Sequence, residues 1–349
     1  MEKQASPRGR SLERDPSAGT GPSSIIYVVN AVFLPRHPLT GLGRGALMLA
    51  SPRRPLLVQL VVTRRCNLSC GYCDEYDSMS SPVDAGLLEK RIDRAGALGT
   101  VVLTLTGGEP LLHPRLDWLV ARVVSRRMVC TLISNGYALT RDWIQRLNDG
   151  GLSMLQMSVD NIAPNEWSQK SWTYVRKKLE LLREHARFGV TINAVLGSST
   201  LEQTREVVAA VREIGFFMTV GLMHNTDGQI QPGLLGGELA TTYREMQRQS
   251  RKSLFHLAGE GWETEMLRGG SAPFKCRAGG RYLYVDELGL VSYCSQRRGS
   301  PGIDLLEYTP DDVEQAFETP KGCEARCTIG CVRRASAFDE WRAQPGGLE

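Results

Sequence analysis

Short apolar runs alternate with helix-like segments along residues 56–224, and this alternation constrains the fold more than any other feature of the sequence. The apolar runs are rich in Leu, Val and Ile, as in strands that are buried on both faces. They lie at 56–63, 101–108, 128–136, 153–160, 190–197 and 216–224. The helix-like segments between them lie at 83–99, 115–127, 141–149, 172–188 and 200–214. This pattern predicts an α/β fold with a parallel sheet, either doubly wound or a partial (β/α)6 barrel.

The predicted strands end in polar or glycine-rich residues. In chain order these ends read TRRC, TGGEP, SNG, SVD, AVLG and GLMH. In both candidate folds the functional groups lie at the carboxyl ends of parallel strands. The strand ends therefore predict one shared site at one rim of the sheet, with His224 as a possible substrate contact.

The flanking segments divide the chain further. Residues 1–24 are rich in Pro, Gly, Ser and charge, which is typical of a disordered tail. We expect an N-terminal extension at 25–55, a core at 56–237 and a smaller C-terminal unit at 238–349. That unit should contain a helix at about 238–257 and short strands at 281–287 and 290–295.

The composition excludes some classes of protein. A net charge of +4 over 349 residues is too small to indicate nucleic acid or an anionic membrane as a partner. The apolar stretch 25–34 is shorter than the roughly 20 residues that span a bilayer, although it could be a strand, a docking helix or a weak surface anchor. We expect a cytoplasmic protein without nucleic-acid or membrane partners.

Eight of the nine cysteines form two groups. A disulfide framework is typical of short secreted chains, whereas this chain is long and has an odd cysteine count. Metal ligation in a reducing compartment is therefore favoured, and the ninth cysteine, Cys130 in a predicted strand, is expected to be a buried apolar residue. The first group is Cys66, Cys70 and Cys73, and the second is Cys276, Cys294, Cys323, Cys327 and Cys331.

The first group offers three soft ligands, which suit zinc or an iron–sulfur cluster. A structural zinc site uses four ligands, and no fourth cysteine or histidine lies nearby in the sequence. A four-iron cluster held by three cysteines would leave one iron open. The acidic residues just beyond, Asp74, Glu75 and Asp77, could contact a substrate or belong to a solvated loop.

The C-x3-C-x2-C spacing, with Tyr72 before the last cysteine, follows the first predicted strand directly. It resembles the cluster-binding motif of the radical S-adenosylmethionine (radical SAM) enzymes. The segments GGEP (107–110), SNG (134–136), SVD (158–160) and INAVLG (192–197) follow in the order found in that family. The resemblance covers about residues 56–224. It implies a partial (β/α)6 TIM-like barrel and a [4Fe–4S] cluster on the first cysteine group, with SAM bound to the open iron.

The resemblance also implies which residues bind SAM. The two glycines would let backbone carbonyls approach its ammonium group, Glu109 would add negative charge there, and Val195 would pack on the adenine. Other interpretations stay open: a turn residue or solvated charge for Glu109, turn or capping roles for the polar residues, and plain core for Val195. The implied set is Tyr72, Gly107, Gly108, Glu109, Pro110, Ser134, Asn135, Ser158, Asp160 and Val195.

The second cysteine group begins with C-x12-G-x4-C, in which Gly289 precedes Cys294. This resembles the SPASM and Twitch extensions, which hold auxiliary clusters after some radical SAM barrels. The rest, C-x3-C-x3-C, departs from the usual C-x2-C start of those extensions. We expect one auxiliary [4Fe–4S] cluster on four of the five cysteines, with zinc as the alternative. A spare thiol could donate a hydrogen atom to a substrate radical, whereas a fully ligated cluster could accept an electron from it.

The resemblance implies a radical SAM enzyme that oxidises, epimerises or cross-links a substrate and draws electrons from a donor such as flavodoxin or ferredoxin. The substrate could be a small molecule, lipid, sugar or peptide. Residues 1–55 look too short and disordered for a peptide-binding domain, which mildly favours a substrate other than a peptide, or a peptide recruited by a partner. A maturase acting on a partner protein, and an electron-transfer or sensing protein that does not cleave SAM, are the alternatives.

Overall fold

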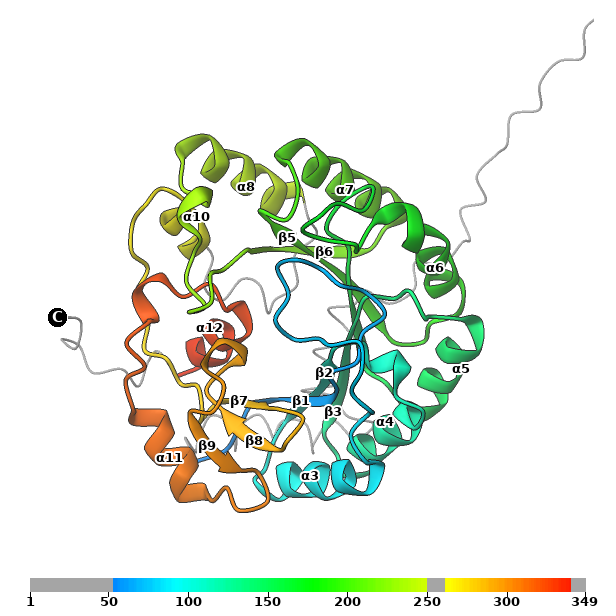
Figure 1. Cartoon of the computed structure of the whole chain (residues 1–349), viewed down its shortest axis with the longest axis vertical. Helices are drawn as coiled ribbons and strands as arrows, with labels where there is room; N and C mark the ends of the chain where they lie inside the picture. The colour runs from blue at the N-terminus through cyan, green and yellow to red at the C-terminus, as the bar shows by residue number, and fades with distance from the viewer. Residues whose placement is uncertain (1–52, 250–260, 340–349) are drawn as a thin grey trace, which may run out of the picture.

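Six parallel strands lie side by side in chain order in the structure, a computed structural model that describes residues 53–249 and 261–339. The strands are β1 (Leu57–Thr63), β2 (Val102–Gly107), β3 (Val129–Ser134), β4 (Met154–Ser158), β5 (Gly189–Leu196) and β6 (Phe217–Leu222). All five pairings between neighbours are parallel. The sheet curls, and its helices lie around the outside (Figure 1). A doubly wound sheet would carry helices on both faces, so the partial barrel is confirmed.

The crossover helices begin and end within a few residues of the predicted ones. Side chains at their N-termini explain several boundaries: Asp84, Thr140 and Thr200 each accept a hydrogen bond from a backbone N–H in the first turn. Gly151 and Gly215 end two of the helices in the left-handed conformation. The helices are α3 (Ala85–Ala97), α4 (Leu116–Ser125), α5 (Arg141–Gly150), α6 (Trp172–His185) and α7 (Leu201–Ile214).

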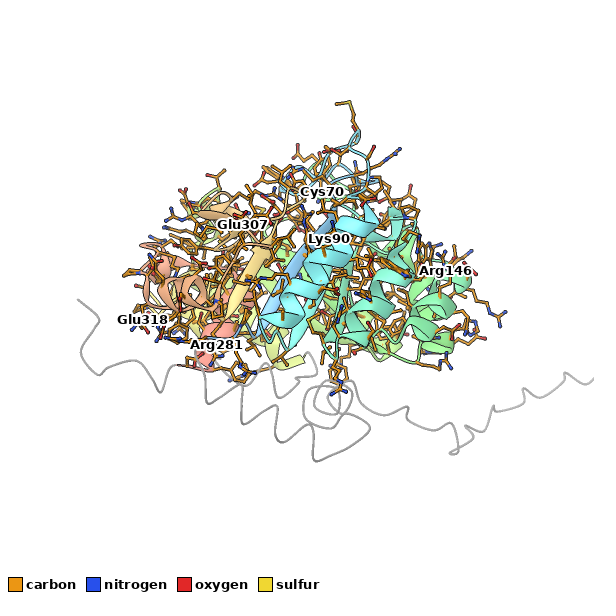
Figure 2. The ribbon with its side chains drawn as sticks, turned by 90° about the horizontal axis from the view of Figure 1, so that it is seen from below. Cys70, Lys90, Arg146, Arg281, Glu307 and Glu318 are labelled. Atoms are coloured by element: carbon orange, nitrogen blue, oxygen red, sulfur yellow. The ribbon has the colours of Figure 1, made fainter. Side chains whose placement is uncertain are left out.

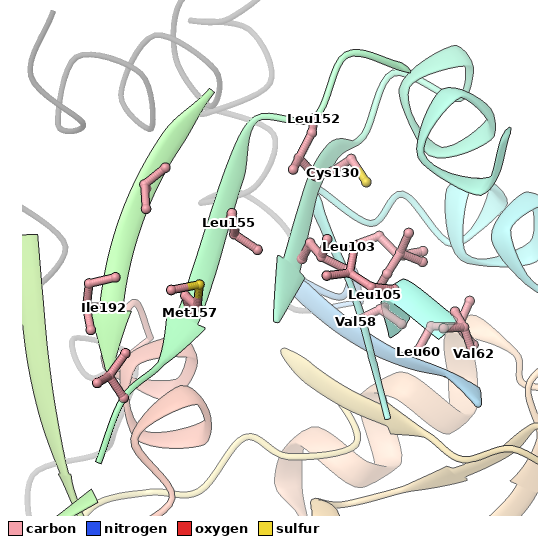
Figure 3. Packing of buried hydrophobic residues seen from close by; sticks show 14 of the residues in the cluster. Val58, Leu60, Val62, Leu103, Leu105, Cys130, Leu152, Leu155, Met157 and Ile192 are labelled. Atoms are coloured by element: carbon pink, nitrogen blue, oxygen red, sulfur yellow. The ribbon is translucent and has the colours of Figure 1, made fainter. Parts of the chain in front are cut away.

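One hydrophobic cluster fills the space between the sheet and these helices. Val58 and Leu60 of β1 and Leu103 and Leu105 of β2 are fully buried in it (Figure 3). Cys130 of β3 is also fully buried there, which confirms its prediction as an apolar core residue. Successive side chains of a strand point to opposite faces, so the alternate residues of each strand face the inside of the barrel.

The C-terminal segment continues the same sheet. Strand β7 (Tyr282–Val285) pairs parallel with β1, and β8 (Leu290–Ser292) and β9 (Pro301–Asp304) follow as antiparallel neighbours. Strand β9 was not predicted, because its sequence PGID carries no apolar alternation. In Figure 1 the C-terminal segment lies between α8 (Gly237–Gln249) and α3. It therefore adjoins both the first and the last part of the six-stranded barrel.

Short elements complete the described chain. The remaining helices are α10 (Trp262–Leu267), α11 (Pro310–Glu318) and α12 (Gly330–Ala337). The 3₁₀ turns are η1 (Pro110–Leu112), η2 (Pro232–Leu234), η3 (Ser295–Arg297) and η4 (Glu324–Arg326). No helix within the described ranges is long and apolar enough to cross a membrane.

The predicted tail at 1–24, nearly all of the extension at 25–55, and the second half of the helix expected at 238–257 lie outside the described residues. The domain boundaries stay predictions.

Candidate active site

The first cysteine group lies on the loop that follows β1. This loop crosses the barrel at the carboxyl ends of the strands (Figure 1), and Figure 2 shows Cys70 at that rim, far from Arg281 at the other end of the molecule. Backbone hydrogen bonds close the loop: Cys66 N donates to Asp77 O at 2.9 Å, and Asp77 N donates to Arg64 O at 2.9 Å. Asp77 therefore shapes the loop, as its side chain also does by accepting from Ser80 N at 2.7 Å.

The three thiols lie among hydrogen-bond donors. Cys66 Sγ accepts from Leu68 N, and Cys70 Sγ accepts from Gln169 N, each at 3.4 Å. Burial raises the pKa of Cys66 to about 11 and also raises the pKa of Cys73. Without a metal, Cys66 and Cys73 are therefore protonated at neutral pH, and metal binding must displace their protons. The donor set, three soft sulfurs on one tight loop, fits an iron–sulfur cluster.

Within residues 53–249 and 261–339, no three His, Cys, Asp or Glu side chains converge on one point as ligands of a single metal ion would. In a four-iron cluster each cysteine binds a different iron, so its ligands need not share one point.

The glycines of GGEP have a structural role in addition to their predicted one. A Cβ on Gly107 would lie 2.1 Å from Thr63 O, and one on Gly108 would lie 2.3 Å from Arg64 O. Gly107 also has a φ of +132°, which side-chain-bearing residues rarely adopt. The end of β2 therefore packs on the backbone that begins the cysteine loop, and only glycine fits there. A contact of these carbonyls with SAM stays a prediction.

Glu109 is fully buried, so its interpretation as a solvated charge is wrong. Its carboxylate accepts from Leu111 N at 2.9 Å, Ser134 Oγ at 2.8 Å and Asn135 N at 2.7 Å. Burial raises the pKa of this carboxyl, while these hydrogen bonds oppose that rise. Since the backbone N–H of Glu109 donates to Arg65 O, the residue joins the cysteine loop to the ends of β2 and β3.

The SNG segment packs on the first cysteine. Asn135 Nδ2 lies 3.6 Å from Cys66 Sγ and donates to Asn67 Oδ1 at 2.8 Å. Asn135 Oδ1 accepts from Tyr137 N at 2.9 Å, so the segment is also the turn that its sequence suggests. The structure thus brings the segments GGEP (107–110) and SNG (134–136) to the first cysteine group.

Asp160 joins the fourth and fifth strands to the cysteine loop. Its Oδ2 accepts from Tyr72 OH at 2.8 Å and Ser168 Oγ at 2.7 Å, and its Oδ1 accepts from Val195 N at 2.9 Å. Its interpretation as the cap of the next helix is wrong, because Ser171 occupies that position. Ser158, the last residue of β4, and Val195, half-buried on β5, lie at the same rim.

Lys170 also lies at the site, but it was not predicted from the sequence because it belongs to no recognisable motif. Its Nζ donates to Tyr72 OH at 2.7 Å and lies 4.9 Å from the centre of that ring. Burial alone would lower the pKa of Lys170, but Tyr72, Asp160 and the nearby thiols raise it well above its usual value. A charged ammonium group therefore lies beside the first cysteine group.

The second cysteine group gathers at the C-terminal edge of the barrel. Cys276, Cys294 and Cys327 are buried in a second hydrophobic cluster, and Cys331 packs against it. At each of the three buried thiols, the backbone N–H two residues further along opposes the rise in pKa that burial causes, as Leu68 N does at Cys66. Electrostatic interactions connect Cys294 with Cys323 and Cys331 as well, so all five predicted ligands lie in one region.

The loop after β6 contacts this region. His224 pairs with Ile230 and Gln229 pairs with Cys327, both as antiparallel bridges. Thr328 N donates to Gly228 O at 3.0 Å. His224 Nδ1 lies 3.0 Å from Asn225 O, so this side chain is held at the strand end, and its substrate contact stays a prediction.

Comparisons with known proteins give the same assignment as the motifs. Residues 60–230 match the model of the radical SAM superfamily. The PqqA peptide cyclase of Methylocella silvestris is 31% identical over 172 residues, which cover 46% of this chain and 44% of that protein. The AdoMet-dependent heme synthase of Methanosarcina barkeri is 24% identical over 334 residues, 83% of this chain and 95% of that protein. The match to the peptide cyclase thus spans less than half of its length.

Among solved structures, Streptococcus suis SuiB bound to the precursor peptide SuiA superposes with a TM-score of 0.57 at 17% identity. The match covers 81% of this chain and 72% of SuiB. It reflects a shared fold. The superfamily match and the geometry of the cysteine loop identify residues 60–230, which carry the first cysteine group and the strand ends, as a radical SAM domain.

Proposed function

We propose that this chain is a radical SAM enzyme that modifies a peptide. The main support is the position of the cysteine loop. It lies over the strand ends, and hydrogen bonds of Glu109 and Asp160 connect it to them. A protein that only carries electrons does not need these polar motifs at the carboxyl ends of the strands. The geometry therefore favours an enzyme that binds and cleaves SAM.

Cys66, Cys70 and Cys73 would hold a [4Fe–4S] cluster, with SAM beside it. When bound, the cluster would supply the electron for the reductive cleavage of SAM, and SAM would supply the radical chemistry that removes hydrogen from the substrate. Lys170 places a positive charge beside the thiolates and can pair with the carboxylate of SAM. Tyr72, held between Lys170 and Asp160, fixes the loop in front of the third cysteine.

Two relatives support a peptide as the substrate: one is a peptide cyclase, and the other is solved with a precursor peptide. The sequence mildly favoured a small molecule, lipid or sugar, or a peptide recruited by a separate partner; these relatives move the preference toward a peptide. The heme synthase, which matches over nearly its whole length, supports a small-molecule substrate as the second candidate.

Four of the five C-terminal cysteines would hold an auxiliary cluster, as in a SPASM or Twitch extension. The gathering of these thiols, with backbone N–H donors aimed at three of them, supports this assignment. An electron donor such as flavodoxin or ferredoxin stays part of the proposal.

Isotope transfer tests the function without knowledge of the substrate. The holoenzyme is assembled without oxygen, reduced, and given SAM with either a pool of fully deuterated peptides or a pool of deuterated small metabolites. We expect 5′-deoxyadenosine to form, and to carry deuterium in the presence of the peptide pool. Deuterium from the metabolite pool alone would favour the second candidate, and the absence of 5′-deoxyadenosine from a fully assembled enzyme would contradict the proposal.

A further inference from the structure

The inner face of the barrel differs from its outer face in burial. Leu155 and Met157 of β4 and Ile192 of β5 point outward into the hydrophobic cluster and are fully buried (Figure 3). Gln156 and Asn193 alternate with these residues along the two strands, so their side chains point inward, and both are partly exposed. Solvent therefore reaches the inner face of the sheet at β4 and β5.

The inner face also differs in polarity. We call the inward-facing residues of β2–β6, which alternate with the buried outward-facing ones, the inner wall. In these described strands it consists of Thr, Gln, Asn, Ser, Val, Ile, Met, Phe and Gly, and it contains no charged side chain. Closed (β/α)8 barrels are filled by bulky branched residues instead. An accessible wall of amide and hydroxyl groups is suited to binding a ligand rather than to packing as a core.

The charged residues of the site lie above the inner wall, at the rim. Glu109 belongs to the segment that follows β2, and Asp160 and Lys170 belong to the loop that follows β4. Asn193 lies two residues before Val195, whose backbone N–H donates to Asp160 Oδ1 at 2.9 Å. Two residues of strand span roughly 7 Å, so the uncharged wall begins directly below the charged rim.

Gln156 and Asn193 are diagonal neighbours on the inner wall, because Asn193 pairs with Ser158 and Gln156 pairs with Thr191. Thr219 Oγ1 donates to Asn193 Oδ1 at 2.8 Å, which holds this side chain by its oxygen. The NH2 group of Asn193 can then donate to a ligand, and Gln156 offers both a carbonyl oxygen and an NH2 group. Together the two side chains can bind the C=O and the N–H of a peptide.

The lack of charge on the inner wall of these strands indicates which part of a substrate can enter. A carboxylate, ammonium or guanidinium group that leaves water needs an opposite charge, whereas an uncharged amide needs only hydrogen-bond partners. We infer that Gln156 and Asn193 hydrogen-bond the backbone of the peptide substrate inside the barrel, and that the residue to be modified is uncharged. This inference rests on the proposed function and names the chemistry of the substrate for the same site.

Residue-specific labelling tests the chemistry of the substrate. The reduced holoenzyme is given SAM and peptide libraries of one composition, each with a single amino-acid type deuterated. We expect deuterium in 5′-deoxyadenosine from an uncharged residue type. Deuterium from Asp, Glu, Lys or Arg would overturn the inference but leave the peptide function intact. If 5′-deoxyadenosine forms but takes deuterium from no library, the peptide function itself fails, and the inference fails with it.

Two variants test the residues, with the library that transfers deuterium as the probe. Gln156→Met and Asn193→Leu keep the size of each side chain but remove its hydrogen-bonding groups. The readout is deuterium in 5′-deoxyadenosine per SAM cleaved, which does not depend on the fraction of enzyme that carries clusters. We expect this ratio to fall about tenfold in each variant, because an amide of the substrate loses its partner. The affinity for SAM, measured by equilibrium dialysis, should stay unchanged.

Gln145→Met is the matched control, because it makes the same chemical change at an exposed position on the outer helix α5. Its ratio should stay within about twofold of wild type, as is usual for surface substitutions. Wild-type ratios in both Gln156→Met and Asn193→Leu would overturn the inference. So would weaker SAM binding in both variants, because the two amides would then belong to the SAM site.

Discussion

At the scale of single residues, the site depends on a few buried polar side chains that each join several elements. Glu109 and Asp160 together accept six hydrogen bonds from different segments of the chain. Buried carboxylates are stable only when such donors surround them. The GGEP and SVD segments, whose sequences suggest a turn and a helix cap, therefore hold the cysteine loop in place.

Lys170 should raise the reduction potential of the first cluster. Its ammonium group interacts electrostatically with Cys66, Cys70 and Cys73, and a nearby positive charge favours the reduced, more negative state. We expect Lys170→Met to lower the potential by an amount on the order of tens of millivolts. A redox titration followed by electron paramagnetic resonance measures it.

The control for this experiment is Lys177→Met, which removes an exposed lysine from the outer helix α6 and should leave the potential unchanged. An equal shift in both variants, or none in Lys170→Met, would rule out a local effect of Lys170.

At the scale of elements, the ends of strands β1 and β2 pack so closely that side chains are excluded between them. Gly108 N donates to Thr63 O at 2.8 Å, and the Gly108 Cα faces the carbonyls of Arg64 and Arg65. The start of the cysteine loop thus depends on the neighbouring strand as well as on its own sequence.

Gly108→Ala should destabilise the protein and reduce iron binding. The new Cβ would lie 2.3 Å from Arg64 O and 2.5 Å from Arg65 O, and backbone cannot move aside as a side chain can. Overpacking of this kind costs about 1–3 kcal/mol. Thermal unfolding and iron per chain measure the effect.

Gly233→Ala serves as its control, because a Cβ there meets nothing within 4 Å and the variant should unfold like wild type. A Gly108→Ala protein with wild-type stability and iron content would show that the loop tolerates displacement.

At the scale of the whole molecule, the C-terminal segment is part of the barrel wall. Strand β7 extends the sheet beyond β1, while residues next to Cys327 pair with the loop after β6. The second cysteine group is thereby held at a defined place relative to the first. The ion pair between Glu75, two residues beyond Cys73, and Arg298, four residues beyond Cys294, joins the two segments.

Iron analysis should find about eight irons per chain, as two four-iron clusters require. We predict that the buried Cys276 is one of the four auxiliary ligands, so Cys276→Ala should lower this number to about four while leaving the first loop intact. Cys130→Ala, in the apolar core, should leave the iron count unchanged. About four irons together with zinc in the wild-type protein would instead support the zinc alternative.

The resemblance of the motifs to a known family chose the partial barrel over a doubly wound sheet, and with it the strand order. The sequence patterns alone were enough to predict the six strands, the crossover helices and the grouping of the first three cysteines. These features depend on local patterns: apolar periodicity, helix caps and ligand spacing are each contained in about twenty neighbouring residues. The positions of the strand-end motifs followed from the same patterns, because parallel strands bring their carboxyl ends to one rim.

Only the tertiary structure decided what the individual polar residues contact. Lys170 is 98 residues from Tyr72 in the sequence, and Arg298 is 223 residues from Glu75, so no local pattern could pair them. It also showed that Asp160 binds the loop instead of capping a helix, and that β7 joins the sheet beside β1. The physical reason is that hydrogen bonds and charge pairs depend on distance in space, which the fold alone sets for residues far apart in the chain.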